Sequence, residues 1–389
     1  MLNFVYDNKT EIIFGKDTLK EVSKLTKRFG SKVLLHYGGG SIIRNKIYDK
    51  IINSFKENKI DYLELGGVVP NPKLGLVKEG IKLCREENVD FILAVGGGSV
   101  IDSAKAIALG FYYDGDVWDF YSKGIIPKKV LPIGVVLTIP ASGSESSTAT
   151  VITNEDGDFK RGYGDISIRP KFAILNPEFT FTLPNYQTAC GAVDIIGHVI
   201  ERYFTNTTNV ELTDRLCEGI MRTVINNAPI VIKDNNNYAS RAEIMWAGSL
   251  AHNNLVGTGR EQDWASHGLE MELSAIYDIA HGAGLAIIYP AWMRYVYKHD
   301  LERFALFANK VFDIEVNKNN LEETALKGID ALENFYKVIK MPTRLHEVNI
   351  DNTHFEEMAD KLLSSGNKTI GNFVKLNKED MINIYNLAL

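Results

Sequence analysis

The sequence has little cysteine and no long apolar run. Its 389 residues include three widely spaced cysteines, Cys84, Cys190 and Cys217, which excludes a disulfide framework and a CxxC metal or redox motif. No stretch approaches the roughly 20 apolar residues that a membrane-spanning helix needs. The first residues include an acid, Asp7, where a signal peptide would have its basic flank and apolar run. We therefore expect a cytoplasmic protein without a membrane partner.

An excess of positive charge is also absent. Lys and Arg number 43 against 49 Asp and Glu, which gives a formal net charge of −6. A nucleic-acid-binding protein needs clustered basic residues to neutralise phosphates, so this balance argues against nucleic acid as a partner. With 45% hydrophobic and 24% charged residues, the composition is that of an ordinary globular protein. At roughly 150 residues per domain, the length predicts two or three domains.

The first half of the chain alternates short β-branched runs with amphipathic helical patterns. This alternation predicts βαβ units and a doubly wound parallel sheet. The expected strands are 32–37, 61–65, 91–95 and 130–138, and the expected helices are 75–84, 100–109 and one through Ile43, Ile47, Ile51 and Phe55. The segment 4–14 alternates enough to form an extra strand or hairpin, of a kind that often pairs with a neighbouring subunit.

After Pro184 the strand signals almost vanish, and helical periodicity dominates in 188–203, 210–226 and 241–256. We therefore predict an α/β domain over residues 1–184 and a mostly helical domain over residues 185–389.

Two triple-glycine turns follow expected strands and precede expected helices, at Gly38–Ser41 and Gly96–Ser99. Neither is a GxGxxG fingerprint, because Ile43 and Ile101 fill the last small position, and neither is a P-loop. Glycines let the backbone approach a ligand, and a helix N-terminus favours an anion. A single turn of this kind could simply connect a strand to a helix. Two of them in adjacent βα units favour a dinucleotide or phosphate site.

The choice of cofactor depends on the first turn, which contains no acid. In NAD-binding proteins, a carboxylate at the end of an early strand commonly holds the ribose 2′-hydroxyl. Here Gly38, Gly39 and Ser41 leave room for a 2′-phosphate, and Arg44 is a candidate counter-charge, so we predict NADP(H). In the second turn, Asp102 is either a helix-start acid or a hydrogen-bond partner for a ribose or amide.

The segment 191–201 carries Asp194 and His198 among apolar residues. Four residues apart on a helix, the two side chains share a face, about 5–6 Å apart at Cβ. The helix is apolar nearly all round, so it is expected to be buried. A buried carboxylate beside a buried imidazole needs a partner, and these two residues alone fit a simple Asp–His hydrogen bond as well as a metal.

Two further histidines, His267 and His281, favour the metal. On one straight helix they would lie about 21 Å apart, so residues 274–278 must turn the chain and His281 must open the next helix. Three imidazoles and a carboxylate suit a divalent cation, but they do not separate iron from zinc, cobalt or nickel. The other histidines lack such settings: His36, His252, His299, His346 and His354.

Taken together, these motifs resemble the iron-containing (group III) alcohol dehydrogenases, from one end of the chain to the other. The similarity is strongest to the NADPH-dependent butanol dehydrogenase and aldehyde reductase subgroup. It is carried by 37–41, Pro70-Asn71-Pro72, 96–102, 138–145, Leu183-Pro184, the Asp194/His198 helix and the His267 and His281 segments.

The resemblance implies a Rossmann-like dinucleotide-binding domain, an all-helical metal-binding domain and an active site in the cleft between them, as in the dehydroquinate synthase-like fold. It implies a divalent metal, Fe²⁺ first, held by Asp194, His198, His267 and His281, which are also the catalytic residues. It implies cofactor contacts from Gly38, Gly39, Ser41, Asn71, Gly97, Gly98, Ser99, Asp102, Thr138, Ser147 and Lys160. The implied protein is a homodimer that interconverts short-chain aldehydes such as butanal and primary alcohols such as 1-butanol, with the metal polarising the carbonyl.

Two positions depart from the family pattern. Met271 stands where members often have a supporting or proton-relay histidine, and Asn176 stands where they usually have an acid. The first puts a histidine relay in doubt, so we expect the proton to travel through water and cofactor ribose hydroxyls.

Three rival hypotheses remain. A dehydroquinate-synthase-like lyase would need a strongly cationic pocket, whereas Trp264 and Met271 favour a small apolar aldehyde. The second rival is an NAD-linked diol or glycerol dehydrogenase of the same fold, and cofactor preference would distinguish it from an NADP(H)-linked enzyme. A non-enzymatic metal-binding or storage protein would not need the paired glycine turns.

Overall fold

The computed structural model describes residues 1–364 and 366–389, and its chain forms two compact units. The sheet unit consists of residues 7–183 and 235–253. The helical unit consists of residues 1–6, 184–234 and 254–389. Two segments lie in a different unit from the one expected for a division at residue 184. The first six residues belong to the helical unit, and helix α9 (Tyr238–His252) belongs to the sheet unit.

A six-stranded parallel sheet forms the centre of the sheet unit. Its strands, in spatial order, are β1 (Glu11–Phe14), β8 (Phe172–Leu175), β5 (Ile133–Leu137), β4 (Phe91–Gly96), β2 (Lys32–Gly38) and β3 (Asp61–Val68). Every residue of β4 and β5 is buried, as expected for central strands covered on both faces. The predicted doubly wound α/β architecture is confirmed.

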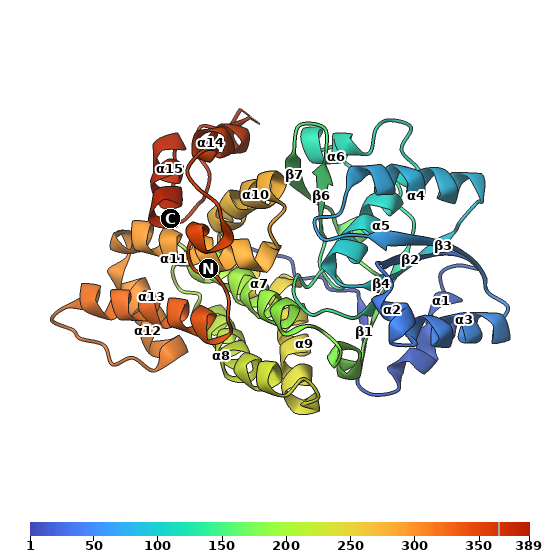
Figure 1. Ribbon diagram of the computed structural model, residues 1–389, viewed down its shortest axis with the longest axis horizontal. Helices are drawn as coiled ribbons and strands as arrows, with labels where there is room; N and C mark the ends of the chain where they lie inside the picture. Colours follow the sequence, from blue (N-terminus) through green and yellow to red (C-terminus); the bar gives the residue numbers. More distant parts are fainter. Residues whose placement is uncertain (365) are drawn as a thin grey trace. The chain divides into compact units, whose positions relative to one another are not determined.

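Helices cover both faces of this sheet, and Figure 1 shows α4 and α5 on one side and α1 and α3 on the other. The helices are α1 (Val22–Thr26), α2 (Ser41–Arg44), α3 (Ile47–Glu57), α4 (Leu74–Glu86), α5 (Gly98–Phe111) and α6 (Trp118–Lys123), with 3-10 turns at Thr18–Glu21, Ile166–Ile168 and Pro177–Thr180. Helix α9 joins the core that contains α4 and α5 through Met245. Its Trp246 ring meets Phe14 edge-on, with 6.1 Å between centroids.

Three local features of the sheet unit depart wholly or partly from the sequence predictions. The helix predicted through Ile43 and Phe55 is broken at Lys46, which has φ 58°. In α2 the buried residue is Ile42 rather than Ile43, so the apolar face of α3 does not continue through the predicted position. Within 4–14, Glu11–Phe14 forms the extra strand, one of the two expected alternatives, and it pairs in parallel with β8 rather than forming a hairpin. An antiparallel pair, β6 (Ala149–Asn154) and β7 (Phe159–Gly164), was not predicted.

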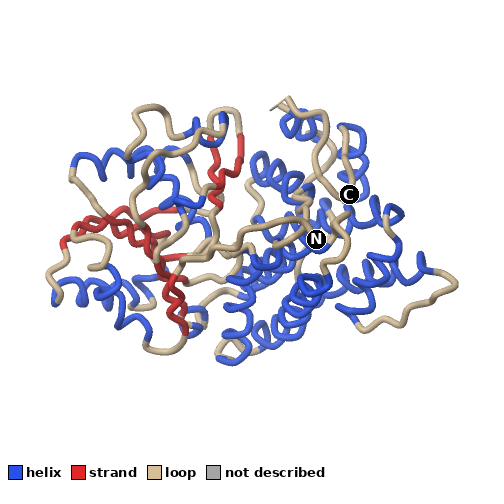
Figure 2. Tube along the Cα trace, turned by 180° about the vertical axis from the view of Figure 1, so that it is seen from behind, coloured by secondary structure: helices blue, strands red, loops and turns tan. Residues whose placement is uncertain are grey.

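The helical unit confirms the helical periodicity seen after Pro184. Its helices are α7 (Asn185–Tyr203), α8 (Glu211–Lys233), α10 (Ala265–Tyr277), α11 (His281–Val296), α12 (Leu301–Phe312), α13 (Leu321–Val338), α14 (Phe355–Leu363) and α15 (Lys378–Leu387), with 3-10 turns at Leu255–Gly257, Tyr297–His299 and Leu345–Val348. In Figure 2 the strands, drawn in red, all belong to the sheet unit. Over residues 1–364 and 366–389, no helix combines the length and the apolar character that crossing a bilayer requires.

His36 makes the stability of the sheet unit depend on pH. It is fully buried on β2, where Nδ1 lies 2.8 Å from the Leu65 carbonyl oxygen and Nε2 lies 2.8 Å from Ser103 Oγ. Burial lowers the pKa of His36 to about 4, whereas the unfolded chain takes up this proton near the ordinary value of about 6.5.

Between these two pKa values, only the unfolded chain binds the proton. The contribution of His36 to the free energy of unfolding is therefore fully present above about pH 6.5 and is lost as the pH falls toward 4. Linkage predicts a loss of about 2 kcal/mol in unfolding free energy from this group between pH 7 and pH 5. Urea unfolding at both pH values would measure it. The variant His36→Gln, which does not titrate, should lack this part of the pH dependence, and an unchanged dependence would contradict the prediction.

Candidate active site

Helix α7 carries two buried polar residues on one face, as predicted. Asp194 and His198 are both 4% exposed, and Asp194 Oδ1 lies 3.3 Å from His198 Nδ1. Their helix is buried along nearly its whole length after Ala189, because apolar residues surround them. The pair therefore sits where water does not solvate it.

The other two predicted histidines reach this pair from separate helices. Helix α10 ends at Tyr277, the following residue Asp278 has φ 50°, and His281 is the first residue of α11. The predicted turn between His267 and His281 is confirmed. Helix α11 also approaches α7 closely, since a Cβ on Gly282 would lie 2.3 Å from the Cys190 carbonyl oxygen.

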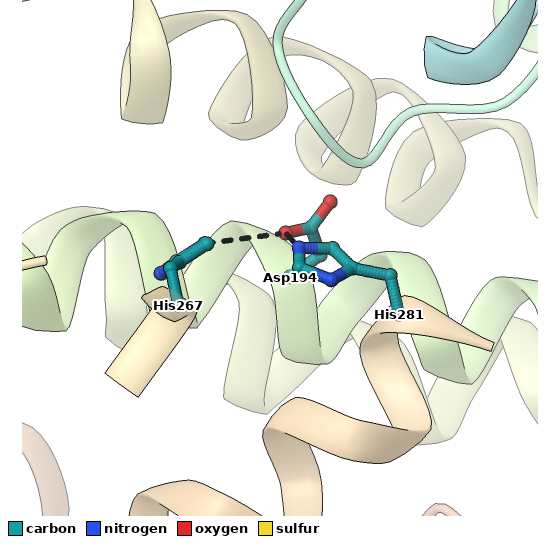
Figure 3. A group of neighbouring side chains, drawn as sticks. All are labelled: Asp194, His267 and His281. Atoms are coloured by element: carbon teal, nitrogen blue, oxygen red, sulfur yellow. Dashed lines mark ion pairs between the residues drawn. The ribbon is translucent and has the colours of Figure 1, made fainter. Parts of the chain in front are cut away.

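Three of the four predicted ligands converge. Asp194, His267 and His281 each offer a ligand atom within 4.8 Å of the others. Figure 3 shows the Asp194 carboxylate between the two imidazoles, and its Oδ1 lies 3.6 Å from His281 Nε2 and 3.9 Å from His267 Nε2. His198 adjoins this group through Asp194, and its ring centroid is 4.8 Å from that of His267.

These donor atoms fit a divalent cation. Asp194 Oδ1 and His267 Nε2 are buried, and among the described residues neither has a hydrogen-bond partner. Two buried polar atoms without hydrogen bonds are costly, and a cation between them would satisfy both. One carboxylate with imidazole nitrogens is a donor set that suits iron or zinc.

The electrostatics of Asp194 and His198 agree with this assignment, and those of His267 do not. Burial opposes ionisation of Asp194, but the neighbouring imidazoles of His198, His267 and His281 outweigh it and hold its pKa well below the usual range. Burial lowers the pKa of His198 to about 3, so this ring is neutral, as a metal ligand must be. Burial would also lower the pKa of His267, yet the carboxylates of Asp194 and Glu201 raise it to about 9. Without a metal this ring therefore carries a proton at neutral pH, which a bound cation has to displace.

Glu201, one of two carboxylates that sequence reasoning missed, fixes the orientation of His267. Its Oε1 lies 2.7 Å from His267 Nδ1 and accepts the His267 backbone N–H at 2.9 Å. Its Oε2 accepts the backbone N–H of Trp264 at 2.6 Å, and the Tyr289 hydroxyl donates to Oε1 at 3.1 Å. With Nδ1 engaged in this way, Nε2 of His267 faces Asp194, which is the arrangement of a carboxylate-supported metal ligand.

Glu270, the second missed carboxylate, does the same for His281. It is fully buried, its Oε2 contacts His281 Nδ1, and its Oε1 contacts the Ser274 hydroxyl. Each of the two carboxylates stands three residues after a candidate ligand, His198 or His267, on a mainly apolar helix. A buried acid at that spacing is the sequence signal that could have identified both.

The predicted cofactor residues all belong to the sheet unit. Gly97, Gly98 and Ser99 lie at the N-terminus of α5, and Gly38, Gly39 and Ser41 lie where β2 ends and the short helix α2 begins. Asn71 has φ 52°, and the Thr138 N–H donates to the Gly96 carbonyl at 3.0 Å. Ser147 lies in the loop before β6, and Lys160 lies on β7.

Asp102 is occupied within the protein. Its Oδ1 accepts the Ser144 hydroxyl at 2.6 Å, and its Oδ2 accepts the Val151 backbone N–H at 2.9 Å. The carboxylate therefore ties α5 to the chain that precedes and begins β6.

Comparison with known families agrees with this geometry. Residues 9–177 match the family described as "Iron-containing alcohol dehydrogenase", and residues 188–389 match "Fe-containing alcohol dehydrogenase family, C-terminal". The chain belongs to the iron-containing alcohol dehydrogenase family. Membership makes it an alcohol dehydrogenase, and it implies a nicotinamide cofactor and a divalent metal for which the Asp194 group is the candidate site.

Relatives of this alcohol dehydrogenase match it over nearly its whole length. The "Probable NADH-dependent butanol dehydrogenase 2" of Bacillus subtilis is 46% identical and covers 100% of both chains. The "NADPH-dependent aldehyde reductase YqhD" of Escherichia coli is 36% identical over 95% of both chains. A crystal structure described as NADH-dependent butanol dehydrogenase A from Thermotoga maritima superposes with a TM-score of 0.96 and 40% identity, covering 100% of this chain and 99% of the other.

The two departures from the family pattern have different surroundings in this dehydrogenase. Asn176 caps the 3-10 turn Pro177–Thr180, where its Oδ1 accepts the Glu178 backbone N–H at 3.0 Å. An aspartate would accept the same bond, so the amide conserves this role. Met271 is half-buried on α10, one residue after Glu270, and it offers no titratable group.

Proposed function

We propose that this enzyme interconverts short-chain aldehydes and primary alcohols, with butanal and 1-butanol as representative substrates. The observation that carries the proposal is the convergence of Asp194, His267 and His281 on α7, α10 and α11. Among the described residues, the buried atoms Asp194 Oδ1 and His267 Nε2 have no hydrogen-bond partner. Relatives named butanol dehydrogenase and aldehyde reductase support the substrate class.

The roles of the residues follow from their contacts. Asp194, His198, His267 and His281 would hold the metal, while Glu201 and Glu270 hold the imidazoles of His267 and His281 in orientation. When bound, the divalent cation supplies a Lewis acid to the substrate oxygen, and the nicotinamide cofactor supplies the hydride.

The proton for the alcohol product needs a source other than residue 271. A methionine thioether cannot donate a proton at any accessible pH, so the position of the family histidine provides none. We propose water and the cofactor ribose hydroxyls as the route, with Lys160 near the nicotinamide ribose, as the family resemblance implies.

The two lines of evidence on cofactor preference differ. The acid-free turn at Gly38–Ser41 predicts NADP(H), and the Arg44 guanidinium supports this, since Nη1 lies 3.9 Å from where a Cβ on Gly40 would stand. However, Arg44 is exposed, so water and salt screen its charge. Four relatives at 42–46% identity are named NADH-dependent. We therefore propose NAD(H) as the preferred cofactor, with NADP(H) as the alternative that Arg44 favours.

One assay tests the activity and the preference together. The oxidation of NADH and of NADPH is followed by absorbance with butanal, using anaerobically iron-loaded enzyme and a chelated control. We expect oxidation that needs the metal, with a higher kcat/KM for NADH. Arg44→Ala should lower kcat/KM for NADPH more than for NADH. No oxidation with any short aldehyde would contradict the proposed function. A preference for 1,3-propanediol or glycerol would favour the alternative, a diol dehydrogenase. A 1,3-propanediol oxidoreductase of known structure is 26% identical to this chain.

We also propose a cytoplasmic homodimer. Strand β1 stands at the edge of the sheet in the order β1-β8-β5-β4-β2-β3, and an edge strand presents unpaired backbone groups that a second copy can use. Light scattering in solution would give the subunit number, and a monomer at micromolar concentration would contradict the homodimer.

A further inference from the structure

Lys105 is a buried charged residue that the proposed reaction does not use. It lies in the middle of α5 and is 0% exposed. A lysine is almost never fully buried unless its ammonium group is paired or hydrogen-bonded. The ammonium group of Lys105 must therefore have hydrogen-bond partners inside the protein.

Five oxygen atoms surround the Lys105 ammonium, and all come from one short segment. Nζ lies 2.8 Å from the Ser144 carbonyl and 2.9 Å from its hydroxyl. It lies 3.1 Å from the Ser147 carbonyl, 3.3 Å from its hydroxyl and 2.7 Å from the Ala149 carbonyl. We name residues 142–149 the serine loop. With three N–H donors for these oxygens, the ammonium holds the serine loop at several points.

Asp102 reinforces this attachment from the same helix. It stands three residues before Lys105, so the two side chains share one face of α5. Its carboxylate accepts the Ser144 hydroxyl at 2.6 Å and the Val151 backbone N–H at 2.9 Å, and its own carbonyl accepts the Thr150 hydroxyl at 2.9 Å. An acid and a base one helical turn apart thus bind consecutive parts of the same segment.

Helix α9 holds the serine loop from another direction. The Ser249 hydroxyl contacts Glu145 Oε1, and His252 Nδ1 lies 2.7 Å from the Ser142 carbonyl. Gly143 has φ +61°, and a Cβ there would lie 2.8 Å from the Gly248 carbonyl. The loop is therefore fixed between two helices of the sheet unit.

The serine loop touches the turn that is expected to bind the cofactor. A Cβ on Gly98 would lie 2.4 Å from Ser142 Oγ. Ser142 therefore lies directly against the N-terminus of α5, whose first backbone N–H groups have no partner within the helix. A displaced serine loop would change the shape of this turn.

We propose that Lys105 is a positioning residue for the nicotinamide cofactor, whose buried ammonium group holds the serine loop against the N-terminus of α5 before the cofactor binds. The proposal rests on the proposed function, and it assigns Asp102 and Ser144 to the same task. It predicts that weakening this attachment costs cofactor affinity rather than metal affinity.

The test compares three variants of the full-length enzyme. Lys105→Met keeps the length of the side chain without its charge, and Ser144→Ala removes the hydroxyl that links Lys105 to Asp102. Lys78→Met, the matched control, removes a surface lysine that pairs with Asp116 at 2.6 Å. The readouts are NADH binding by fluorescence titration, metal content, steady-state kinetics, and hydrogen exchange of residues 142–151 without cofactor.

We expect Lys105→Met to raise the NADH dissociation constant at least tenfold and Ser144→Ala to raise it severalfold, with faster hydrogen exchange in the serine loop. Metal content should not change, and KM for NADH should rise more than kcat falls. Lys78→Met should resemble the wild type. If Lys105→Met does not fold, the measurements on Ser144→Ala alone test the proposed role of the serine loop. Unchanged NADH affinity and exchange in a folded variant would overturn the proposal, whereas failure of the wild type to bind NADH or NADPH would instead remove the proposed function.

Discussion

Asp194→Asn is expected to abolish metal retention and aldehyde reduction. Asp194 Oδ1 is the atom toward which His198, His267 and His281 converge, at 3.3, 3.9 and 3.6 Å. An amide in its place removes the single negative charge of the donor set and presents a poorer ligand. Lewis-acid stabilisation is worth several kcal/mol, and each 1.4 kcal/mol is about tenfold in rate, so we expect a loss of at least about 1,000-fold in kcat/KM.

The measurement pairs metal content with butanal-dependent NADH oxidation after anaerobic iron loading. Glu218→Gln is a suitable control, because Glu218 is a buried acid of the same unit whose carboxylate accepts hydrogen bonds from Tyr203 at 3.0 Å and Arg215 at 2.7 Å, neither of which belongs to the donor set. His198→Ala would show whether the fourth predicted ligand is needed. An Asp194→Asn enzyme that keeps iron and activity would refute this site.

Glu201→Gln should weaken metal binding by about 10- to 100-fold, which is the usual effect of losing a group that orients a ligand. The Glu201 carboxylate accepts bonds on both oxygens, from the backbone N–H groups of His267 and Trp264 and from the Tyr289 hydroxyl. A glutamine must turn its NH₂ toward one of these donors. The His267 ring then loses both its fixed orientation and a neighbouring negative charge.

Glu270→Gln should have a smaller effect of the same kind. Its second contact is the Ser274 hydroxyl, which can rotate and accept a bond from an amide. Competition with a chelator of known affinity would measure metal binding in both variants, again with Glu218→Gln as the control. Equal affinity in all three proteins would show that these carboxylates do not support the metal site.

The sequence could predict what depends on local pattern. The alternation of β-branched runs with amphipathic helical patterns predicted the parallel sheet, and the spacing of His267 and His281 required the turn that the structure has at Asp278. The family-specific order of these motifs predicted the family that the comparisons confirm.

What the sequence could not predict depends on tertiary contacts. Periodicity identified α9 as a helix, but its place in the sheet unit is decided by Met245 and Trp246, whose partners are distant in the chain. The roles of Glu201 and Glu270 were missed because each supports a histidine on another element or beyond a turn. The role of Lys105 has no signal in the sequence, since only the folded serine loop supplies its five oxygen neighbours.

The placement of α9 also constrains how the chain can acquire its structure during synthesis. The polypeptide passes between the two units after residues 6, 183, 234 and 253. A nascent chain that has only reached residue 183 has all the strands of its sheet but lacks the helix that completes the core around Met245. The sheet unit therefore stays incomplete, with apolar surface exposed, until about 70 more residues have left the ribosome. Synthesis proceeds at roughly 5–20 residues per second. For the same reason, a chain cut at residue 184 yields an incomplete fragment rather than an autonomous nucleotide-binding domain.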